Sequence, residues 1–356
     1  MATLDKKLLF LFLFLFFLLC AGCMHHERSS SVPRETALSK PKFASAISIT
    51  SGAAITVDEQ SGVSGNGEQG LGLFPALKTK NSVEFVDELH GFGVESLLED
   101  LSVLETDNGG KSWRKVSSLA PSTGMHAISF LDDQTGWLLT GESLNRKSEL
   151  RLTSDGGLTW EVIARSIPGF SGLTGNLFFR FFDRQNGLIA LQTTSDMVLL
   201  QTLDGGLTWS VSSRIPLPGA AAGVLTFISP NEGWFVASPN KGGATAVLYR
   251  MSDGERWQEV GKLPDKLAPQ AVSFSSSLNG WLLLQNKEIS PESEWVLLRT
   301  SDGGNSWTLH TFPRTLHPMD TSLQMNFISS VNGWIQSANG LWQTTNGGMK
   351  WTLFMS

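Results

Sequence analysis

The sequence predicts an all-β fold, a β-propeller with six clear four-stranded blades, and two repeated motifs carry this prediction. The first motif, which we call the box, reads TSDGGLTW at residues 153–160. It is present in six copies, and its second residue varies between copies. The second motif is Phe followed six residues later by Gly and usually Trp, and it recurs in step with the box. A unit of 44 to 50 residues with short strands and Gly-rich turns is typical of one propeller blade.

The two motifs account for most of the tryptophan in the chain. Ten of the twelve tryptophans occupy motif positions, so the repeat cannot be an accident of composition. The boxes end at Trp113, Trp160, Trp209, Trp257, Trp307 and Trp351. The second motif begins at Phe85, Phe130, Phe181, Phe227, Phe274 and Phe327.

Each unit is expected to contain four short strands. In the second unit, residues 127–131 and 137–140 flank an Asp-rich turn, and residues 150–153 and 160–164 flank the box. Alternating apolar and polar residues between Gly, Asn and Asp turns indicate β-hairpins. Residues 43–80 contain two further strand-like stretches, 46–50 and 53–57, which leave room for a degenerate seventh blade.

The box has a local mechanical explanation. Its carboxylate can accept hydrogen bonds from backbone N–H groups of its own turn, and its glycines supply positive φ. We therefore predict a structural role, rather than a catalytic or metal-binding one, for the residues at this position. They are Asn108, Asp155, Asp204, Asp253, Asp302 and Asn346. The fourth box is one residue short, and we expect its turn to be distorted.

The N-terminus is typical of an exported lipoprotein. Lys6 and Lys7 precede an apolar run, residues 8–19, that is too short to span a membrane comfortably. Ala21 and Gly22 then precede Cys23, as in the bacterial lipobox, so we expect Cys23 to be acylated. The predicted domains are a signal peptide (1–22), a polar tether (23–42) and the propeller (43–356, with repeats clear from residue 82). An ordinary cleaved signal or a signal anchor is the alternative.

Composition excludes several classes of function. The chain has 27 Lys and Arg against 33 Asp and Glu, and this net charge of −6 argues against a nucleic-acid partner. Both cysteines lie near the N-terminus, at Cys20 and Cys23, so the repeats carry neither a thiol nucleophile nor a cysteine metal site. No phosphate-binding loop and no metal-ligand spacing is present, and we expect no cofactor and no metal.

The boxes and the paired Phe/Gly-Trp motif together resemble a known family. The box is similar to the Asp-box, or bacterial neuraminidase repeat. The pair of motifs, over residues 82–356, resembles the photosystem II stability/assembly factor family of β-propellers and its non-photosynthetic bacterial relatives. This resemblance implies a non-enzymatic, seven-bladed protein that assists the assembly of membrane protein complexes. It therefore implies a binding scaffold at a membrane, with a membrane or envelope protein as partner.

Two rival functions share the same architecture. Sialidases carry the box on six blades, but they need a tyrosine nucleophile with a Glu partner. Tyr249 is the single tyrosine and has no evident partner, and the run from Arg214 to Pro216 echoes the sialidase Arg-Ile-Pro motif at the wrong place. Glycan recognition is the other alternative, with Trp295 and Trp342, the two tryptophans outside the motifs, as candidates for stacking on sugars.

The variable connections predict the binding face. The first-to-second turns and the boxes are nearly uniform, whereas the connections on the opposite face vary in length. Variable loops on a rigid scaffold usually carry binding. A basic residue recurs on that face at Arg165, Arg214 and Lys262, with Arg314 close to the same place in the next unit. These residues are either solvated loop cations or a basic ring near the central channel that grips an acidic protein segment. The insert at residues 285–294 is the alternative location.

Overall fold

The computed structural model describes residues 82–355 apart from eleven short segments. These segments are residues 98–99, 121–124, 143–146, 169–176, 194–195, 217–219, 240–244, 265–266, 287–294, 311–322 and 338–339. The chain divides into two units, Met1–Ser39 and Lys40–Ser356, and every described residue belongs to the second. The predicted signal peptide, the predicted tether, Cys23 and the strand-like stretches before residue 82 therefore lie outside the described residues.

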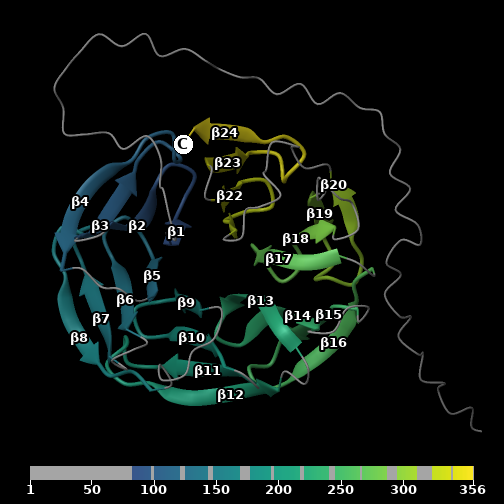
Figure 1. Cartoon of the computed structure of the whole chain (residues 1–356), viewed down its shortest axis with the longest axis horizontal. Helices are drawn as coiled ribbons and strands as arrows, with labels where there is room; N and C mark the ends of the chain where they lie inside the picture. Colours follow the sequence, from purple (N-terminus) through teal and green to yellow (C-terminus); the bar gives the residue numbers. More distant parts are fainter. Residues whose placement is uncertain are drawn as a thin grey trace, which may run out of the picture. The chain divides into compact units, whose positions relative to one another are not determined.

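The described residues form six four-stranded antiparallel sheets, which are the predicted blades (Figure 1). Blade 1 contains β1 (Ser82–Phe85), β2 (Gly91–Leu97), β3 (Asp100–Thr106) and β4 (Arg114–Leu119). Blade 2 contains β5 (Met125–Phe130), β6 (Gly136–Glu142), β7 (Lys147–Thr153) and β8 (Glu161–Arg165). Blade 3 contains β9 (Leu177–Phe181), β10 (Gly187–Gln192), β11 (Asp196–Thr202) and β12 (Ser210–Pro216).

The second half of the ring repeats this order. Blade 4 contains β13 (Ala220–Ser229), β14 (Glu232–Pro239), β15 (Val247–Met251) and β16 (Trp257–Lys262). Blade 5 contains β17 (Leu267–Phe274), β18 (Gly280–Asn286), β19 (Trp295–Thr300) and β20 (Thr308–His310). Blade 6 contains β21 (Gln324–Phe327), β22 (Gly333–Ser337), β23 (Gly340–Thr344) and β24 (Thr352–Met355).

The strands of each blade are paired in chain order, with the first strand innermost and the fourth at the rim (Figure 1). The first strands of neighbouring blades contact one another, as β1 does with β5 and β5 with β9. Blade 6 contacts blade 1 directly through β21 and β1, and the Val83 N–H donates to Gln324 Oε1 at 3.1 Å. A seventh blade between blades 6 and 1, for which the sequence left room, is excluded by this closure.

The strand register explains the fixed spacing from Phe to Gly. In every blade the motif phenylalanine on the first strand lies directly opposite the motif glycine on the second, as Phe130 does with Gly136. The ring covers the glycine so closely that a Cβ atom there would lie 2.5 Å from the Phe130 ring. Glycine is therefore required at this position because the aromatic ring occupies the space of a side chain.

The same ring joins neighbouring blades. Phe181 of blade 3 stacks on Trp137 of blade 2 with ring centroids 3.8 Å apart and planes within 4° of parallel. Its edge meets Trp209, the box tryptophan of its own blade, at 6.0 Å and 85°. Equivalent stacks join blades 4 to 5, 5 to 6 and 6 to 1. The two sequence motifs thus recur in step because they build one aromatic contact between blades.

A hydrogen bond accompanies this stack at four of the six interfaces. The indole Nε1 of Trp137 donates to the carbonyl of Gly205 in the box of the next blade at 3.0 Å. Trp234, Trp281 and Trp334 make the same bond to the following box. The remaining two interfaces carry Phe92 and Leu188 at this position, which have no N–H to donate. Phe92 keeps the stack, on Phe130, at 3.6 Å.

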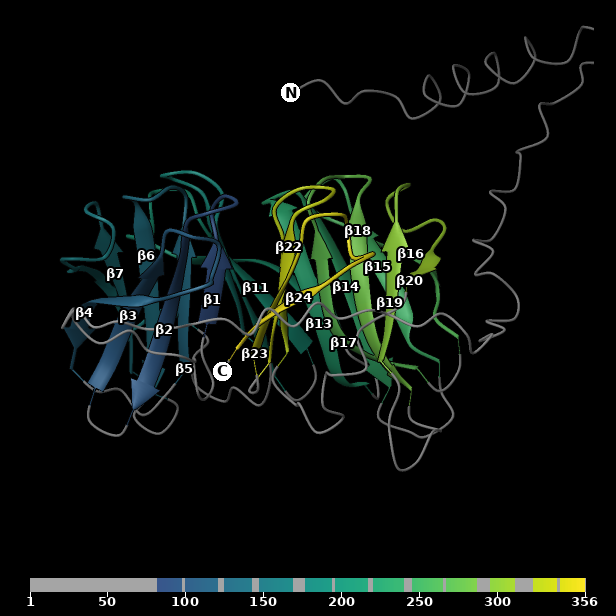
Figure 2. The same cartoon turned by 90° about the horizontal axis from the view of Figure 1, so that it is seen from above.

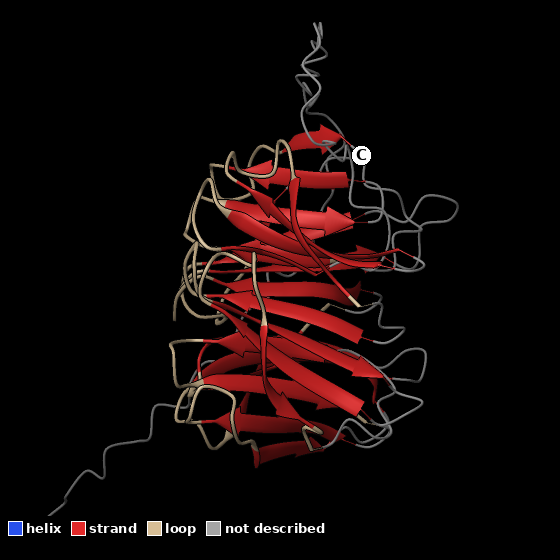
Figure 3. Cartoon of the chain, turned by 90° about the vertical axis from the view of Figure 1, so that its left-hand side faces the viewer, coloured by secondary structure: helices blue, strands red, loops and turns tan. Residues whose placement is uncertain are grey.

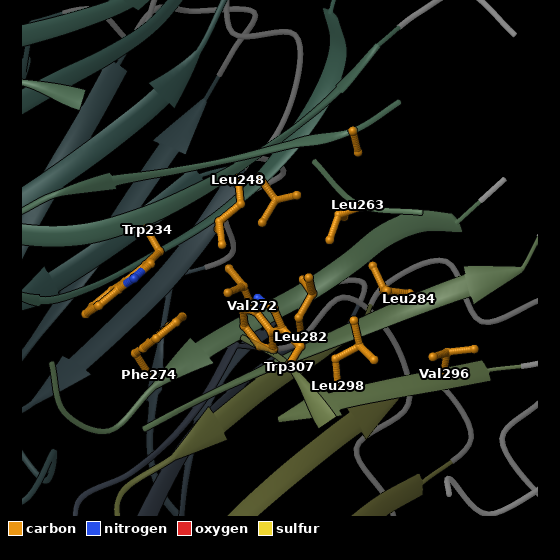
Figure 4. Close-up of a cluster of buried hydrophobic side chains, with 12 residues drawn as sticks. Trp234, Leu248, Leu263, Val272, Phe274, Leu282, Leu284, Val296, Leu298 and Trp307 are labelled. Atoms are coloured by element: carbon orange, nitrogen blue, oxygen red, sulfur yellow. The ribbon is translucent and has the colours of Figure 1, made fainter. Parts of the chain in front are cut away.

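The hydrophobic core is divided among the interfaces between blades. Figure 4 shows one such cluster, in which Trp234, Leu248 and Phe274 pack with residues of β17 to β19. Each cluster draws alternating residues from two adjacent sheets, as expected for faces that are both covered. Stability is therefore distributed around the ring.

The turns divide the ring into two faces. In each blade one hydrogen bond joins the box to the first-to-second turn. The first glycine of the box, which has a positive φ, donates its N–H to a carbonyl of that turn, as Gly156 does to Gln134 at 2.9 Å. Both turn types therefore lie on one side of the strands, as the sequence predicts (Figures 2 and 3). We call this side the box face. The opposite side, where second strands lead to third strands and each blade leads to the next, is the loop face.

Candidate functional site

The box carboxylate organises its own turn. Asp204 Oδ1 accepts hydrogen bonds from the Thr208 N–H at 2.9 Å and from the Thr202 hydroxyl at 2.8 Å. Asp204 Oδ2 accepts from the Thr208 hydroxyl at 2.6 Å. Asp155 and Asp302 make the same set of bonds within their boxes. Both oxygens of these carboxylates are thus already occupied by the turn.

These hydrogen bonds favour the ionised form of the carboxyl group. The Thr208 hydroxyl, followed by the Thr208 backbone N–H, lowers the pKa of Asp204 to about 2. The Thr159 hydroxyl and N–H lower the pKa of Asp155 in the same way. A carboxyl group with a lowered pKa is a poor general acid at neutral pH, so these residues are unsuited to proton donation.

An amide occupies the same place in two boxes. Asn108 Oδ1 accepts from the Ser112 N–H and the Thr106 hydroxyl, both at 3.0 Å. Asn346 Oδ1 accepts from the Lys350 N–H at 2.8 Å. The turn geometry therefore needs an acceptor oxygen at this position but does not need its charge.

The fourth box differs from the other five, as its shortened sequence predicts. Asp253 Oδ1 accepts from the N–H groups of Glu255 and Arg256, which makes a simple Asx turn. Met251 stands where the other boxes have threonine. The buried Trp257 Nε1 has no hydrogen-bond partner, whereas four other box tryptophans donate to a carbonyl of their own box.

Buried threonines connect the glycines of the boxes to the Asp or Asn side chain, a role that was not predicted from the sequence. The hydroxyl of Thr202 accepts from the buried Gly206 N–H at 2.9 Å and donates to Asp204. Threonine recurs two residues before the Asp or Asn in five of six boxes, and this was the available signal. The five are Thr106, Thr153, Thr202, Thr300 and Thr344, each nearly fully buried.

The recurring basic residues lie on outermost strands at the loop face. Arg165 and Lys262 are the last residues of β8 and β16, and Arg214 lies near the end of β12. All three are exposed. Their expected position beside the central channel is wrong, because the fourth strand of each blade is at the rim (Figure 1). Arg314 and the insert at residues 285–294 lie outside the described residues, apart from Gln285 and Asn286 in β18.

Arg165 belongs to a small charged cluster on its blade. Its Nε atom lies 3.1 Å from Glu149 Oε1 on the neighbouring strand, and Arg151 pairs with the other oxygen of that carboxylate. The Arg165 side chain is nevertheless 67% exposed. A single carboxylate shared by two guanidinium groups leaves this cluster with a net positive charge, available to an anionic partner.

A polar position on the innermost strands was not identified from the sequence. The residue before each motif phenylalanine is polar in all six blades, and in four of them it accepts the N–H of the phenylalanine in the next blade. Ser129 Oγ accepts from Phe181 in this way at 2.9 Å. These bonds satisfy backbone groups at the inner edge of each sheet. The six residues are Glu84, Ser129, Arg180, Thr226, Ser273 and Asn326.

Glu84 and Arg180 are the two charged members of this set. Burial raises the pKa of Glu84, and this outweighs the opposing effects of Arg180 and of the Phe130 N–H. Arg180 Nε lies 4.0 Å from Glu84 Oε1 and the guanidinium also reaches the Phe227 carbonyl at 3.5 Å. These contacts link the first strands of blades 1 to 4 along the inner edge of the ring.

The environment of Tyr249 does not support the sialidase hypothesis. Tyr249 lies on β15, half-buried and packed near Phe235. Glu259 stands opposite it on β16, a partner that the sequence analysis did not identify. Burial, followed by the charge of Glu259, raises the pKa of Tyr249. A raised pKa keeps the Tyr249 hydroxyl protonated at neutral pH, so that its use as a nucleophile would depend on a general base.

The two tryptophans considered for sugar stacking are buried. Trp295 and Trp342 belong to the same hydrophobic cluster, between blades 5 and 6. Their expected role as an exposed stacking platform is therefore wrong. Among the residues that the structure describes, none of the exposed large hydrophobic side chains is aromatic.

The described part of the chain lacks two features that would point to a metal or a membrane span. It contains no group of three or more His, Cys, Asp or Glu side chains arranged to hold a metal ion. It also contains no helix with the length and hydrophobicity needed to cross a membrane.

The solved structures similar to this chain are propellers of several functions. No known protein family and no curated protein matches the sequence. The SapL1 lectin in complex with alpha methyl fucoside is 12% identical, with a TM-score of 0.54 over 79% of this chain and 96% of that chain. The fucose-specific lectin from Aleuria aurantia is 13% identical, with a TM-score of 0.52 over 77% and 94%. YCF48 bound to D1 peptide is 18% identical, with a TM-score of 0.48 over 79% and 83%. At these identities the likeness shows the fold alone.

Proposed function

We propose that this chain is a non-catalytic scaffold, held outside the cytoplasm at a membrane, that binds an acidic segment of a membrane or envelope protein. One observation carries the proposal. Arg165, Arg214 and Lys262 occupy equivalent positions on the rims of three neighbouring blades, all exposed and all on the loop face. A repeated cation on a rigid support is suited to an extended anionic partner.

The scaffold positions these cations at little cost in conformational entropy. Each lies on a strand that is paired through its blade, as Arg214 is with Val198 and Lys262 with Val247. The backbone is therefore ordered before any partner arrives, and association loses mainly side-chain freedom. A basic strip also speeds encounter with an acidic segment and makes binding sensitive to salt.

The role in assembly follows from the sequence resemblance. Propellers of the photosystem II stability/assembly factor family assist the assembly of membrane protein complexes, and a chain with the same paired motifs is suited to the same kind of task. A lipid on Cys23 would hold the propeller near such complexes, with residues 23–42 as the polar tether.

Charge reversal on the loop face tests the binding proposal. Wild type, the triple variant Arg165→Glu, Arg214→Glu, Lys262→Glu and a control triple variant would be crosslinked in cells and the captured proteins identified. The control, Lys111→Glu, Arg256→Glu, Lys350→Glu, makes the same charge change on exposed turns of the box face. We expect the loop-face variant alone to lose its partner, and capture to weaken as salt rises. Undiminished capture by that variant would refute the proposed site.

Acylation of Cys23 is tested separately. Radiolabelled fatty acid should be incorporated into the wild-type protein and not into Cys23→Ala, and the variant should be released from the membrane fraction. A wild-type protein that takes up no label would contradict the lipid anchor, while leaving the binding proposal to its own experiment.

A further inference from the structure

The box face carries several exposed apolar side chains among the described residues. Ten large hydrophobic residues are exposed in the described part of the chain, and seven of them lie in first-to-second turns or boxes. The other three, Val211, Leu309 and Leu353, lie on outermost strands. The seven are Leu89, Leu158, Leu203, Leu207, Leu278, Val331 and Met349. Exposed apolar residues that recur at one position of adjacent blades mark an interaction surface more often than scattered single residues do.

Three of these residues occupy the same position in three adjacent blades. Leu278, Val331 and Leu89 each lie four residues after the motif phenylalanine, in blades 5, 6 and 1, and are 55%, 43% and 54% exposed. Blades 2, 3 and 4 have Gln134, Gln185 and Asn231 at this position. We call Leu278, Val331 and Leu89 the apolar arc. Its apolar character is thus confined to one half of the ring.

The arc is held rigidly by its own backbone. The carbonyls of Leu278, Val331 and Leu89 each accept the N–H of a box glycine, at 2.9, 2.8 and 2.8 Å. Next to the arc, Asn332 Nδ2 of blade 6 donates to Glu88 Oε1 of blade 1 at 2.6 Å. The main chain is therefore fixed while the side chains remain in solvent, as in a preformed docking surface.

Charge on the same face indicates the chemistry of the occupant. The first-to-second turns and boxes together carry twelve Asp and Glu but four Lys and Arg, a net of −8 in a chain whose total is −6. Most of these acids lie in blades 1 to 4, whereas the first-to-second turns of blades 5 and 6 carry no charged residue. The turns that carry Leu278 and Val331 are therefore uncharged, whereas Leu89 follows Asp87 and Glu88 and stands at the border with the acidic blades. Anionic lipid and a second copy of this acidic face would both be repelled.

We propose that the apolar arc and the acidic turns beside it form a second docking surface, which binds a cationic amphipathic polypeptide segment. Leucine-like side chains of the segment would cover Leu278, Val331 and Leu89. Its Lys or Arg residues would face the acidic turn of neighbouring blade 2, with Asp132 and Asp133, both exposed. This surface is on the opposite face from Arg165, Arg214 and Lys262 and selects the opposite charge.

A designed peptide tests this surface. A fluorescent amphipathic peptide of leucine and lysine would be titrated with the full-length protein, beside a leucine–glutamate peptide and a lysine–serine peptide. We expect the leucine–lysine peptide alone to bind. The variant Leu89→Ser, Leu278→Ser, Val331→Ser should weaken its binding by about tenfold or more, since three buried apolar contacts are lost. The control Val211→Ser, Leu309→Ser, Leu353→Ser should bind as wild type does.

The same wild-type and variant proteins also distinguish the other molecules that could cover the apolar arc. Equal binding by the arc variant and wild type would overturn the proposal, as would equal binding of the leucine–glutamate peptide. Sedimentation of the protein alone as a dimer that the arc variant abolishes would assign the arc to a second copy. Flotation with anionic vesicles that depends on the arc would assign it to a lipid surface. Each of these results contradicts the cationic segment.

Discussion

A buried threonine in five of the six boxes contributes to the stability of the fold. Thr202 is buried and both accepts from Gly206 and donates to Asp204. The hydroxyl is therefore the link between the glycine turn and the carboxylate. Motif searches that emphasise Asp and Gly would overlook it, because threonine is common at the ends of strands.

Thr202→Val should lower the free energy of unfolding by about 1–3 kcal/mol, because the valine leaves the buried Gly206 N–H without an acceptor at nearly constant volume. Urea or thermal unfolding measures the change. Thr345→Val, at an exposed turn position, is the matched control and should have little effect. Equal loss in both variants would mean that the buried hydroxyl has no special role.

Acid should destabilise the protein partly through Asp204. Its pKa is about 2 in the folded protein and near its ordinary value of 3.8 in the unfolded chain. A lowered folded pKa contributes stability that is complete above the unfolded pKa and is lost as pH falls through the folded value. Asp204→Asn should therefore flatten the fall in unfolding free energy between about pH 4 and pH 2. Parallel profiles for variant and wild type would contradict this assignment.

At the scale of the blade, the sequence is informative because each motif residue has one geometric task. Phe and Gly are paired across two strands, one tryptophan stacks on that Phe, and the box tryptophan meets its edge. The spacing of the motifs therefore predicts the strands, their order and the shared face of the turns. The radial position of Arg165 was not predictable, because periodicity along the chain says nothing about which strand is innermost.

Closure between blades 6 and 1 depends on Trp334. It stacks on Phe85 at 3.9 Å and donates to the Gly109 carbonyl at 3.0 Å. Trp334→Phe keeps the stack, as Phe92 does naturally, and should cost about 1 kcal/mol for the lost hydrogen bond together with a small void. Trp334→Ala should cost about 3–5 kcal/mol. Chemical denaturation compares them, and equal stability of the two variants would show that stacking does not hold the ring closed.

At the scale of the whole molecule, the two faces differ in charge and in chemistry. The box face is acidic, with exposed apolar side chains, whereas Arg165, Arg214 and Lys262 stand on the loop face. The basic positions were predictable from their spacing in the repeat, whereas the near-constant turns of the box face gave no sign of its apolar residues. The apolar arc was not predictable from the repeat, since it depends on which copies depart from the common residue and on their being neighbours in the ring.

Hydrogen exchange tests the central claim, that a partner binds the loop face of a rigid ring, most directly. The chain would be measured alone and with the partner that crosslinking identifies. We predict slower exchange at the ends of β8, β12 and β16, which carry Arg165, Arg214 and Lys262, and no change in the boxes. Protection confined to the boxes, with none at these strand ends, would contradict the account.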